Sequence, residues 1–199
     1  LIHVLRCFED SNITHVEDTI DPLRDKEIVD LELQIKDLEI VDRQIDKILK
    51  KLRTGYKDDV KFLLVLEKIK NKLEKSENLR TLTLDKDENN LIKDLNFLTL
   101  KPILYVCNVS IKDLNCGNTY TDKIHKIVSK ENSEMLTLAV SLEAEIFEIE
   151  DFSDRQSFLN EYQIKQPASL SLINKAYKLL NMQTFFTVGE KEVKAWTIQ

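Results

Sequence analysis

The sequence predicts an α/β fold, a doubly wound parallel sheet into which a long helical hairpin is inserted. Continuous apolar runs typical of buried strands occur at residues 1–8, 103–109 and 135–140. Helical spacing of apolar residues fills the intervals between these runs. The first interval is much longer than the second, so the helical hairpin is expected there.

The first strand, Leu1–Phe8, is expected to be buried and ends in the polar turn Glu9–Asn12. Asp21-Pro22 then marks the turn before a helix. In this helix the apolar residues recur every three or four positions, at Ile28, Leu31, Ile35, Leu38, Val41, Ile45, Ile48 and Leu52. The spacing predicts one continuous seam along the helix.

Thr54-Gly55 is expected to end this helix, with the glycine as C-cap. A second helix from about Lys57 to Lys75 repeats apolar residues at Phe62, Leu66, Ile69 and Leu73. Together they predict an antiparallel helical hairpin, or coiled-coil arm. Two interpretations stay open: an arm that contacts a partner, or a solvated helical pair with no function of its own.

The remaining elements follow in alternation. They are expected as a helix near 86–98, a strand after Pro102, a polar loop at 110–118, a helix at 121–130, a strand at 135–140, and helices near 153–162 and 167–180. Strands at 184–187 and 192–198 predict a hairpin around Gly189. Because two strands alone are marginal in water, this hairpin is expected to open a domain that continues past Gln199.

Composition excludes several classes of protein. The net charge of −6 argues against a generally basic nucleic-acid binder. No apolar stretch reaches the ~18 residues of a membrane span, and no signal peptide is visible. Three cysteines without paired spacing indicate reduced thiols, with Cys107 in a packing role, and the three scattered histidines predict no metal site.

The positions of the three glycines show that the sequence has no phosphate-binding loop motif. A phosphate-binding loop of the GxxxxGK[ST] type brings backbone N–H groups to the phosphates. Gly55, Gly117 and Gly189 are isolated, and none precedes Lys-Ser or Lys-Thr. The chain alone is therefore not expected to hold a nucleoside triphosphate tightly. Because Leu1 opens directly on a strand, the chain is expected to be a piece whose start is missing.

Polar residues at two strand ends are the candidate site. Asn108 ends a buried strand, at the edge where open α/β sheets bind ligands, and its carboxamide can donate and accept against a purine. The alternative is an asparagine that only forms a turn. Ser141 ends the next strand and could touch the same base. It could also cap the helix that begins with Glu143-Ala144-Glu145, and both roles are compatible.

Four segments resemble the YchF-type (Obg-like ATPase) family of P-loop NTPases. They are LIHVLRCFEDSNITHVEDTIDPLRDKEIVDLEL at the start, KPILYVCNVS at 101–110, VSLEAEI at 140–146 and PASLSLINKAYKLLNMQTFFTVGEKEVKAWTI at 167–198. The last is the most specific. The resemblance implies part of a G-domain sheet with a coiled-coil insertion, followed by the start of a β-rich TGS domain. It divides the chain into 1–20 (G domain), 21–100 (insertion), 101–180 (second half of the G domain) and 181–199 (TGS, truncated).

The family resemblance also implies a function. It implies a cytoplasmic, monomeric ATPase or GTPase that uses Mg²⁺, favours ATP and is linked to redox or stress responses. This protein would bind the ribosome or its RNA and no membrane. Asn108 would contact the purine, Val109 would contact it through its backbone, and Ser141, Leu142 and Glu143 would line its far side. The phosphate-binding and magnesium-binding residues would lie upstream, so no catalytic or metal-binding residue is assigned to this chain.

One position departs from the family motif, which has the form Asn-x-x-Glu. Here Ile111 occupies the last position, where guanine-reading relatives have an aspartate. Two guanine donors would remain unpaired, at a cost on the order of 1–3 kcal/mol each. Guanine specificity is therefore not expected, although Asp113 could substitute if the loop were rearranged. The competing hypothesis is a non-enzymatic helical module that binds a protein or RNA without nucleotide.

Overall fold

The computed structural model describes residues 1–199 except 15–16, 18, 54–59, 132 and 199. The chain divides into two compact units, Leu1–Leu23 with Ile103–Gln199 and Arg24–Pro102. None of the helices in the described part of the chain is both long enough and apolar enough to cross a membrane.

The first unit is built on a parallel sheet of β1 (Ile2–Arg6), β2 (Leu104–Asn108) and β3 (Glu134–Leu138), in the order β1-β2-β3. The register pairs Arg6 with Asn108 and Asn108 with Leu138. The carboxyl ends of all three strands therefore meet at one edge. This confirms the predicted α/β class and places Asn108 on the central strand.

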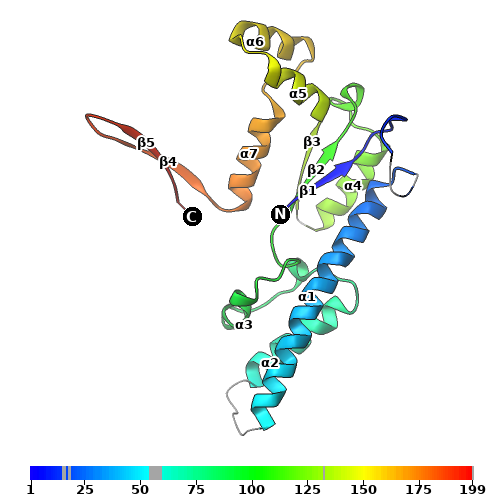
Figure 1. Ribbon diagram of the computed structural model, residues 1–199, viewed down its shortest axis with the longest axis vertical. Helices are drawn as coiled ribbons and strands as arrows, with labels where there is room; N and C mark the ends of the chain where they lie inside the picture. The colour runs from blue at the N-terminus through cyan, green and yellow to red at the C-terminus, as the bar shows by residue number, and fades with distance from the viewer. Residues whose placement is uncertain (15–16, 18, 54–59, 132, 199) are drawn as a thin grey trace. The chain divides into compact units, whose positions relative to one another are not determined.

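Helices cover both faces of this sheet, because alternate residues of a strand point to opposite faces. On one face, Tyr105 and Cys107 of β2 pack with Ile124 and Val128 of α4 (Thr119–Lys130). On the other face, the apolar side chains of β2 and β3 pack against α7 (Ala168–Leu179) through Ala168, Leu172 and Leu179. Figure 1 shows α4 and α7 on either side of the sheet.

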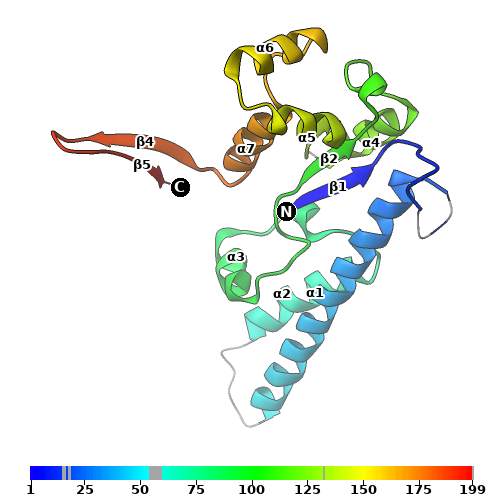
Figure 2. The ribbon, with the colours of Figure 1, turned by 45° about the horizontal axis from the view of Figure 1, so that its top comes forward.

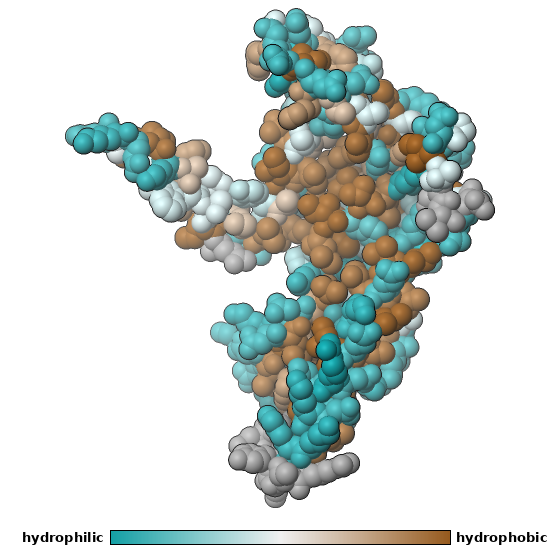
Figure 3. Space-filling model, in the orientation of Figure 1, coloured by the Kyte–Doolittle hydropathy of each residue, from teal (hydrophilic) through white to brown (hydrophobic). Residues whose placement is uncertain are grey.

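The prediction that the first strand is buried is wrong for one of its faces. Leu5 is buried, but Ile2 is 49% and Val4 59% exposed. Both residues pair with β2 positions that face α7, and α7 packs on β2 and β3 rather than on β1. Hydrophobic residues gather on the surface over the sheet in Figure 3.

Two further helices follow β3. They are α5 (Val140–Glu148) and α6 (Phe152–Glu161), which pack on each other through Leu142, Ile146 and Leu159. Asp151 begins α6 as its N-cap, since its side chain accepts hydrogen bonds from the N–H groups of Ser153 and Asp154.

The predicted hairpin near the end of the chain is confirmed as β4 (Gln183–Val188) paired antiparallel with β5 (Val193–Ile198). The Gly189 N–H donates to the carbonyl of Glu192 and closes the turn at 2.9 Å. Every residue of both strands is exposed. That this hairpin opens a TGS domain stays a prediction.

The second unit contains most of α1 (Pro22–Arg53), then α2 (Val60–Leu73) and α3 (Lys86–Ile92). Figures 1 and 2 show α1 and α2 side by side. Short 3-10 turns lie at Leu79–Thr81 and Lys93–Leu95. The core of this unit combines apolar residues from both long helices and from the returning segment: Val41, Ile48, Val65, Leu66, Ile69, Leu73, Leu79, Ile92 and Phe97.

The predicted apolar seam is confirmed for α2 and for the second half of α1, but it is wrong for the first half. Ile28, Leu31 and Ile35 are exposed. A polar row is buried instead: Lys26, Asp30, Gln34 and Asp37. The expected glycine cap at Gly55 lies outside the described residues.

The returning segment explains why Gln34 and Asp37 are buried on α1, while the buried Lys26 and Asp30 pair with each other at 2.7 Å. The Asp37 carboxylate accepts hydrogen bonds from the Leu98 N–H (2.8 Å) and from the Thr99 N–H and hydroxyl (both 2.7 Å). Gln34 Nε2 donates to Asn78 Oδ1 at 2.9 Å. Residues 78–79 and 96–99 form no strand, so their backbone groups need such side-chain partners once they are buried.

Candidate functional site

The carboxyl edge of the sheet brings Asn108 next to the start of α5. Its Oδ1 accepts a hydrogen bond from the Val140 N–H at 3.1 Å. The side chain is half-buried, and within the described part of the chain no acceptor is found for its Nδ2 group. The amide therefore keeps two donor hydrogens for a ligand at this edge.

The first turn of α5 adds backbone donors beside Asn108. Its N-cap is Ala139, whose methyl side chain cannot accept a hydrogen bond from the first N–H groups. The Val140 N–H is taken by Asn108, and the Glu143 N–H donates to Ala139 O. For the N–H groups of Ser141 and Leu142 no acceptor is found among the described residues, so this helix end favours a ligand with acceptor atoms.

The prediction that Ser141 caps this helix is wrong. The helix begins at Val140, three residues before the predicted start at Glu143. Ser141 is therefore inside the first turn, where its hydroxyl is exposed to solvent. It follows Val140, whose N–H bonds to Asn108, so it lies at the same edge of the sheet. A contact between Ser141 and a ligand stays a prediction.

The two residues after Ser141 have structural partners. The Leu142 side chain is buried between α5 and α6, so only its backbone is open to a ligand. The Glu143 carboxylate accepts from the N–H groups of Ala168 (2.7 Å) and Ser169 (3.0 Å) at the start of α7. Glu143 thus caps α7 and joins two helices.

Val109 lies next to Asn108 with its side chain buried under α4. Its N–H donates to Leu138 O at 2.9 Å and extends the pairing of β2 with β3. A backbone contact with a base would therefore involve its carbonyl oxygen, for which no donor is found among the described residues.

The loop that follows is held by Asn118. Asn118 Nδ2 donates to Cys7 O (2.8 Å) and to Asp113 Oδ2 (3.0 Å), and its Oδ1 accepts from the N–H groups of Tyr120 and Thr121. Ser110 Oγ donates to the same Asp113 oxygen at 2.8 Å. The hydrogen bonds from Asn118 and Ser110 lower the pKa of the Asp113 carboxyl.

Asn118 therefore ties the end of β1, the loop after β2 and the start of α4 into one frame. The sequence pattern alone predicts Asn118 only as the end of a polar loop. Asn118-x-x-Thr121 ahead of an apolar helical stripe was an available signal, because it forms a capping box.

Ile111 is in a 3-10 turn (Ile111–Asp113) after Asn108. Its side chain is half-buried and packs against the apolar cluster between α5 and α6. The position that carries an acid in the family motif is here part of an apolar contact.

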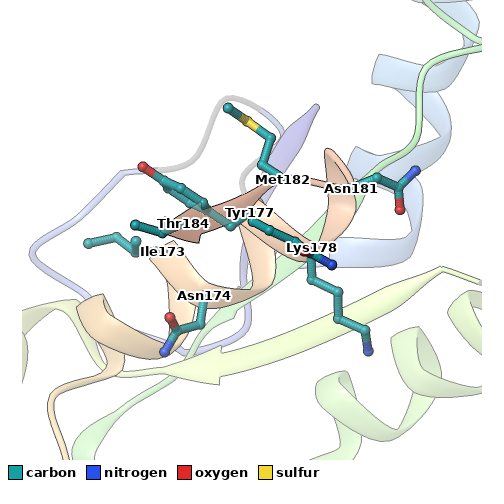
Figure 4. Close-up of a pocket in the computed structure, with 8 residues that line it drawn as sticks. Ile173, Asn174, Tyr177, Lys178, Asn181, Met182 and Thr184 are labelled. Atoms are coloured by element: carbon teal, nitrogen blue, oxygen red, sulfur yellow. The ribbon is translucent and has the colours of Figure 1, made fainter. Parts of the chain in front are cut away.

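A pocket lies elsewhere in this unit, between the C-terminal half of α7 and the residues leading into β4 (Figure 4). It is lined by Ile173, Asn174, Tyr177, Lys178, Asn181, Met182, Gln183 and Thr184. Lys178 Nζ donates to Glu134 at 2.7 Å, and Glu134 begins β3. The pocket is therefore at the amino edge of the sheet, opposite Asn108.

The residues that the structure describes do not form a ligand set for magnesium. Among the described residues no three His, Cys, Asp or Glu side chains gather as ligands.

Cys7 and Cys107 are both fully buried under α4, so neither thiol is accessible at the surface.

Curated relatives resemble the chain over almost its whole length. It is 42% identical over 196 residues to the ribosome-binding ATPase YchF of Escherichia coli O157:H7, covering 98% of this chain and 53% of that protein. It is 38% identical over 201 residues to the ribosome-binding ATPase YchF of Bacillus subtilis, covering 100% of this chain and 55% of that protein. No family model matches the chain.

A solved structure agrees with these relatives. The YchF GTPase of Schizosaccharomyces pombe superposes with a TM-score of 0.83 at 29% identity, covering 100% of this chain and 54% of that one. The chain spans about half the length of the relatives that it matches. The resemblance on which the sequence analysis relied is thus confirmed along nearly the whole chain.

Proposed function

Because the chain is homologous over nearly its whole length to YchF proteins, we propose that it is the base-reading, arm-bearing part of a P-loop NTPase. The parent protein hydrolyses ATP, or GTP less readily, and acts at the ribosome. It is a cytoplasmic monomer, linked to redox or stress responses. In this proposal the four segments keep the limits 1–20, 21–100, 101–180 and 181–199.

The open donors around Asn108 are the observation that carries this proposal. Asn108 Nδ2 and the N–H groups of Ser141 and Leu142 lie at one edge with the carbonyl of Val109, for which the described residues supply no donor. Adenine presents ring-nitrogen acceptors together with an exocyclic N6–H₂ donor. Donors from Asn108 and α5 with an acceptor from Val109 complement this pattern. Glu143 supports the same edge by holding α5 against α7.

Hydrolysis itself requires groups that this chain does not supply. In P-loop enzymes, catalysis comes from positioning the phosphates and from Mg²⁺, which neutralises their charge. We assign both to the part of the parent outside this chain, because no phosphate-binding loop occurs in its sequence. The chain alone is then inactive, and its share of the work is to bind and orient the base.

Substitution of Asn108 in the full-length protein tests the base contact. Asn108→Ala removes the Nδ2 donors, and we expect ATP to bind about tenfold more weakly, about 1.4 kcal/mol. Isothermal titration with ATP and Mg²⁺ measures the change. Asn108→Asp keeps an oxygen for the Val140 N–H but has no Nδ2, so it should not restore affinity. Asn160→Ala, at an exposed position on α6, is the control.

Two results would contradict the proposal at different levels. Unchanged affinity in Asn108→Ala, or restored affinity in Asn108→Asp, would remove the Asn108 amide from the base contact. A full-length wild-type protein whose Tm does not rise with ATP and Mg²⁺ would favour the alternative, a helical module that binds a partner without nucleotide.

A further inference from the structure

Two phenylalanines project from the α5–α6 pair into solvent. Phe147, near the end of α5, is 87% exposed, and Phe152, the first residue of α6, is 76% exposed. Phe147 is the most exposed large apolar side chain in the described part of the chain. Four residues lie between the two positions, so their Cα atoms are five residue steps and at most about 18 Å apart. They can belong to one contact surface.

The core of the unit does not use these side chains. The pair α5–α6 is held by Ile146, Leu142 and Leu159, which are almost fully buried. Phe147 follows Ile146 directly and points away from this cluster, as its exposure shows. Exposed aromatic side chains that packing does not require are typical of a binding surface.

Four carboxylates lie close to the two phenylalanines in the sequence, between residues 145 and 154. Glu145, Glu148, Glu150 and Asp154 are all exposed, and no ion pair is found for them among the residues that the structure describes. These four carboxylates, Phe147 and Phe152 make up the α5–α6 surface.

Two other carboxylates of this segment are already engaged. Asp151 caps α6, and Glu143 caps α7. From residue 140 to residue 164 the only basic residue is Arg155, whose guanidinium donates to the carbonyl of Ile149. The negative charge of the surface is therefore not balanced locally.

We propose that the α5–α6 surface is a docking site for a basic, amphipathic segment of a partner protein. Apolar side chains of the partner cover Phe147 and Phe152, while its lysines or arginines pair with the surrounding carboxylates. An aromatic centre within a charged rim is the usual arrangement of a protein interface. This proposal does not depend on the nucleotide site, since neither phenylalanine belongs to it.

The same charges argue against other ligands. Nucleic acid and anionic lipid surfaces carry negative charge, which the unpaired carboxylates would repel. A second copy of the surface would place like charges opposite each other in a symmetric contact. A basic protein segment is the occupant that satisfies both the rings and the carboxylates.

Defined peptides test the proposal on the full-length protein. The probe is a fluorescent 18-residue helical peptide of lysine and leucine with one apolar face, and the controls are its glutamate–leucine counterpart and a single-stranded RNA of 12 nucleotides. Fluorescence anisotropy gives the affinities. We expect only the lysine–leucine peptide to bind, and to bind at least tenfold more weakly to the double variant Phe147→Ser/Phe152→Ser.

A second variant separates charge from apolar contact. Glu148→Lys/Glu150→Lys keeps both rings, and we expect it to weaken the lysine–leucine peptide and to reduce the salt dependence of its binding. Leu64→Ser, at an exposed position on α2, is the matched control and should bind like the wild type. Because all these residues are exposed, each variant should keep the wild-type Tm.

The proposal is overturned if the lysine–leucine peptide does not bind, or if it binds equally well to the phenylalanine variant. It is also overturned if the glutamate–leucine peptide or the RNA binds as tightly. ATP should bind to the same phenylalanine variant as tightly as to the wild type. A negative result with the peptide would therefore count against the docking surface and not against the proposed NTPase function.

Discussion

At the residue scale, Ile111 shows how one position can change both packing and recognition. Its side chain joins the apolar cluster between α5 and α6, close to Leu114. A carboxylate at this position would pair with the donors of guanine, but it would lose this apolar contact. Asp113 is two residues further on, and its Oδ2 is already held by Ser110 and Asn118.

This arrangement predicts the base preference of the full-length protein. We expect ATP to bind at least as tightly as GTP, because no carboxylate is available for the N1–H and N2–H₂ donors of guanine. Competition titrations with the two nucleotides measure the ratio.

Asp113→Asn tests whether Asp113 substitutes for the missing acid. The asparagine can keep the hydrogen bonds to Ser110 and Asn118, so the ratio of ATP to GTP affinity should not change. A tenfold preference for GTP in the wild type, or a selective loss of GTP binding in Asp113→Asn, would contradict this account.

At the element scale, carboxylates from other elements bind both ends of α7. Glu143 of α5 caps its first turn. At the other end, Glu134 of β3 accepts from Lys175 Nζ (2.6 Å) and Lys178 Nζ (2.7 Å). The hydrogen bonds from Lys175 and Lys178 lower the pKa of Glu134 to about 2.

The lowered pKa of Glu134 predicts how stability depends on pH. In the unfolded chain this carboxyl titrates near its ordinary value of 4.5. Its contribution is therefore fully present above pH 4.5 and is lost as the pH falls towards 2. Because the ion pairs are partly exposed, the effect is reduced by solvent and salt.

Urea denaturation at pH 5 and at pH 3 measures this contribution. We expect Glu134→Gln to be less stable than the wild type at pH 5, and the difference to be smaller at pH 3. Glu161→Gln, at an exposed position on α6, is the control. A difference between Glu134→Gln and the wild type that stays the same at both pH values would exclude this linkage.

At the scale of the whole molecule, the chain consists of two units with separate cores. One core lies on the two faces of the sheet, and the other joins α1, α2 and the returning segment. The residues proposed to read the base all belong to the first unit. The second unit, Arg24–Pro102, carries the helical arm.

Because the two units have separate cores, we expect that nucleotide binding and ribosome binding can be separated. We expect replacement of Arg24–Pro102 by a flexible Gly/Ser linker to leave ATP affinity unchanged but to weaken co-sedimentation of the full-length protein with ribosomes. This deletion is preferable to one limited to the two long helices, because Leu79 and Phe97 pack against them and would be exposed.

Centrifugation with purified ribosomes and ATP titration measure the two properties. Asn108→Ala serves as the reciprocal control, with weaker ATP binding and an intact arm. If sedimentation of the linker variant equals that of the wild type, the arm is a solvated helical pair without a role in ribosome binding.

The position of the elements could be predicted because their signals are local. The apolar run before Asn108 is β2, and the four-three-four spacing of Phe62, Leu66, Ile69 and Leu73 is α2. Less of the site could be predicted. Asn108 and Ser141 do lie beside each other, but the buried Leu142 side chain and the capping role of Glu143 depend on α6 and α7.

The sequence by itself determined the α/β class, the inserted helical pair, the final hairpin and the absence of a phosphate-binding loop, because each follows from periodicity or from a contiguous motif. Only the tertiary structure decided which face of α1 is buried. Asp37 satisfies backbone groups 61 and 62 residues away, so a polar row is inside while Ile28, Leu31 and Ile35 face solvent. Hydrogen-bond partners so distant in sequence leave no trace in local apolar spacing, and packing alone selects them.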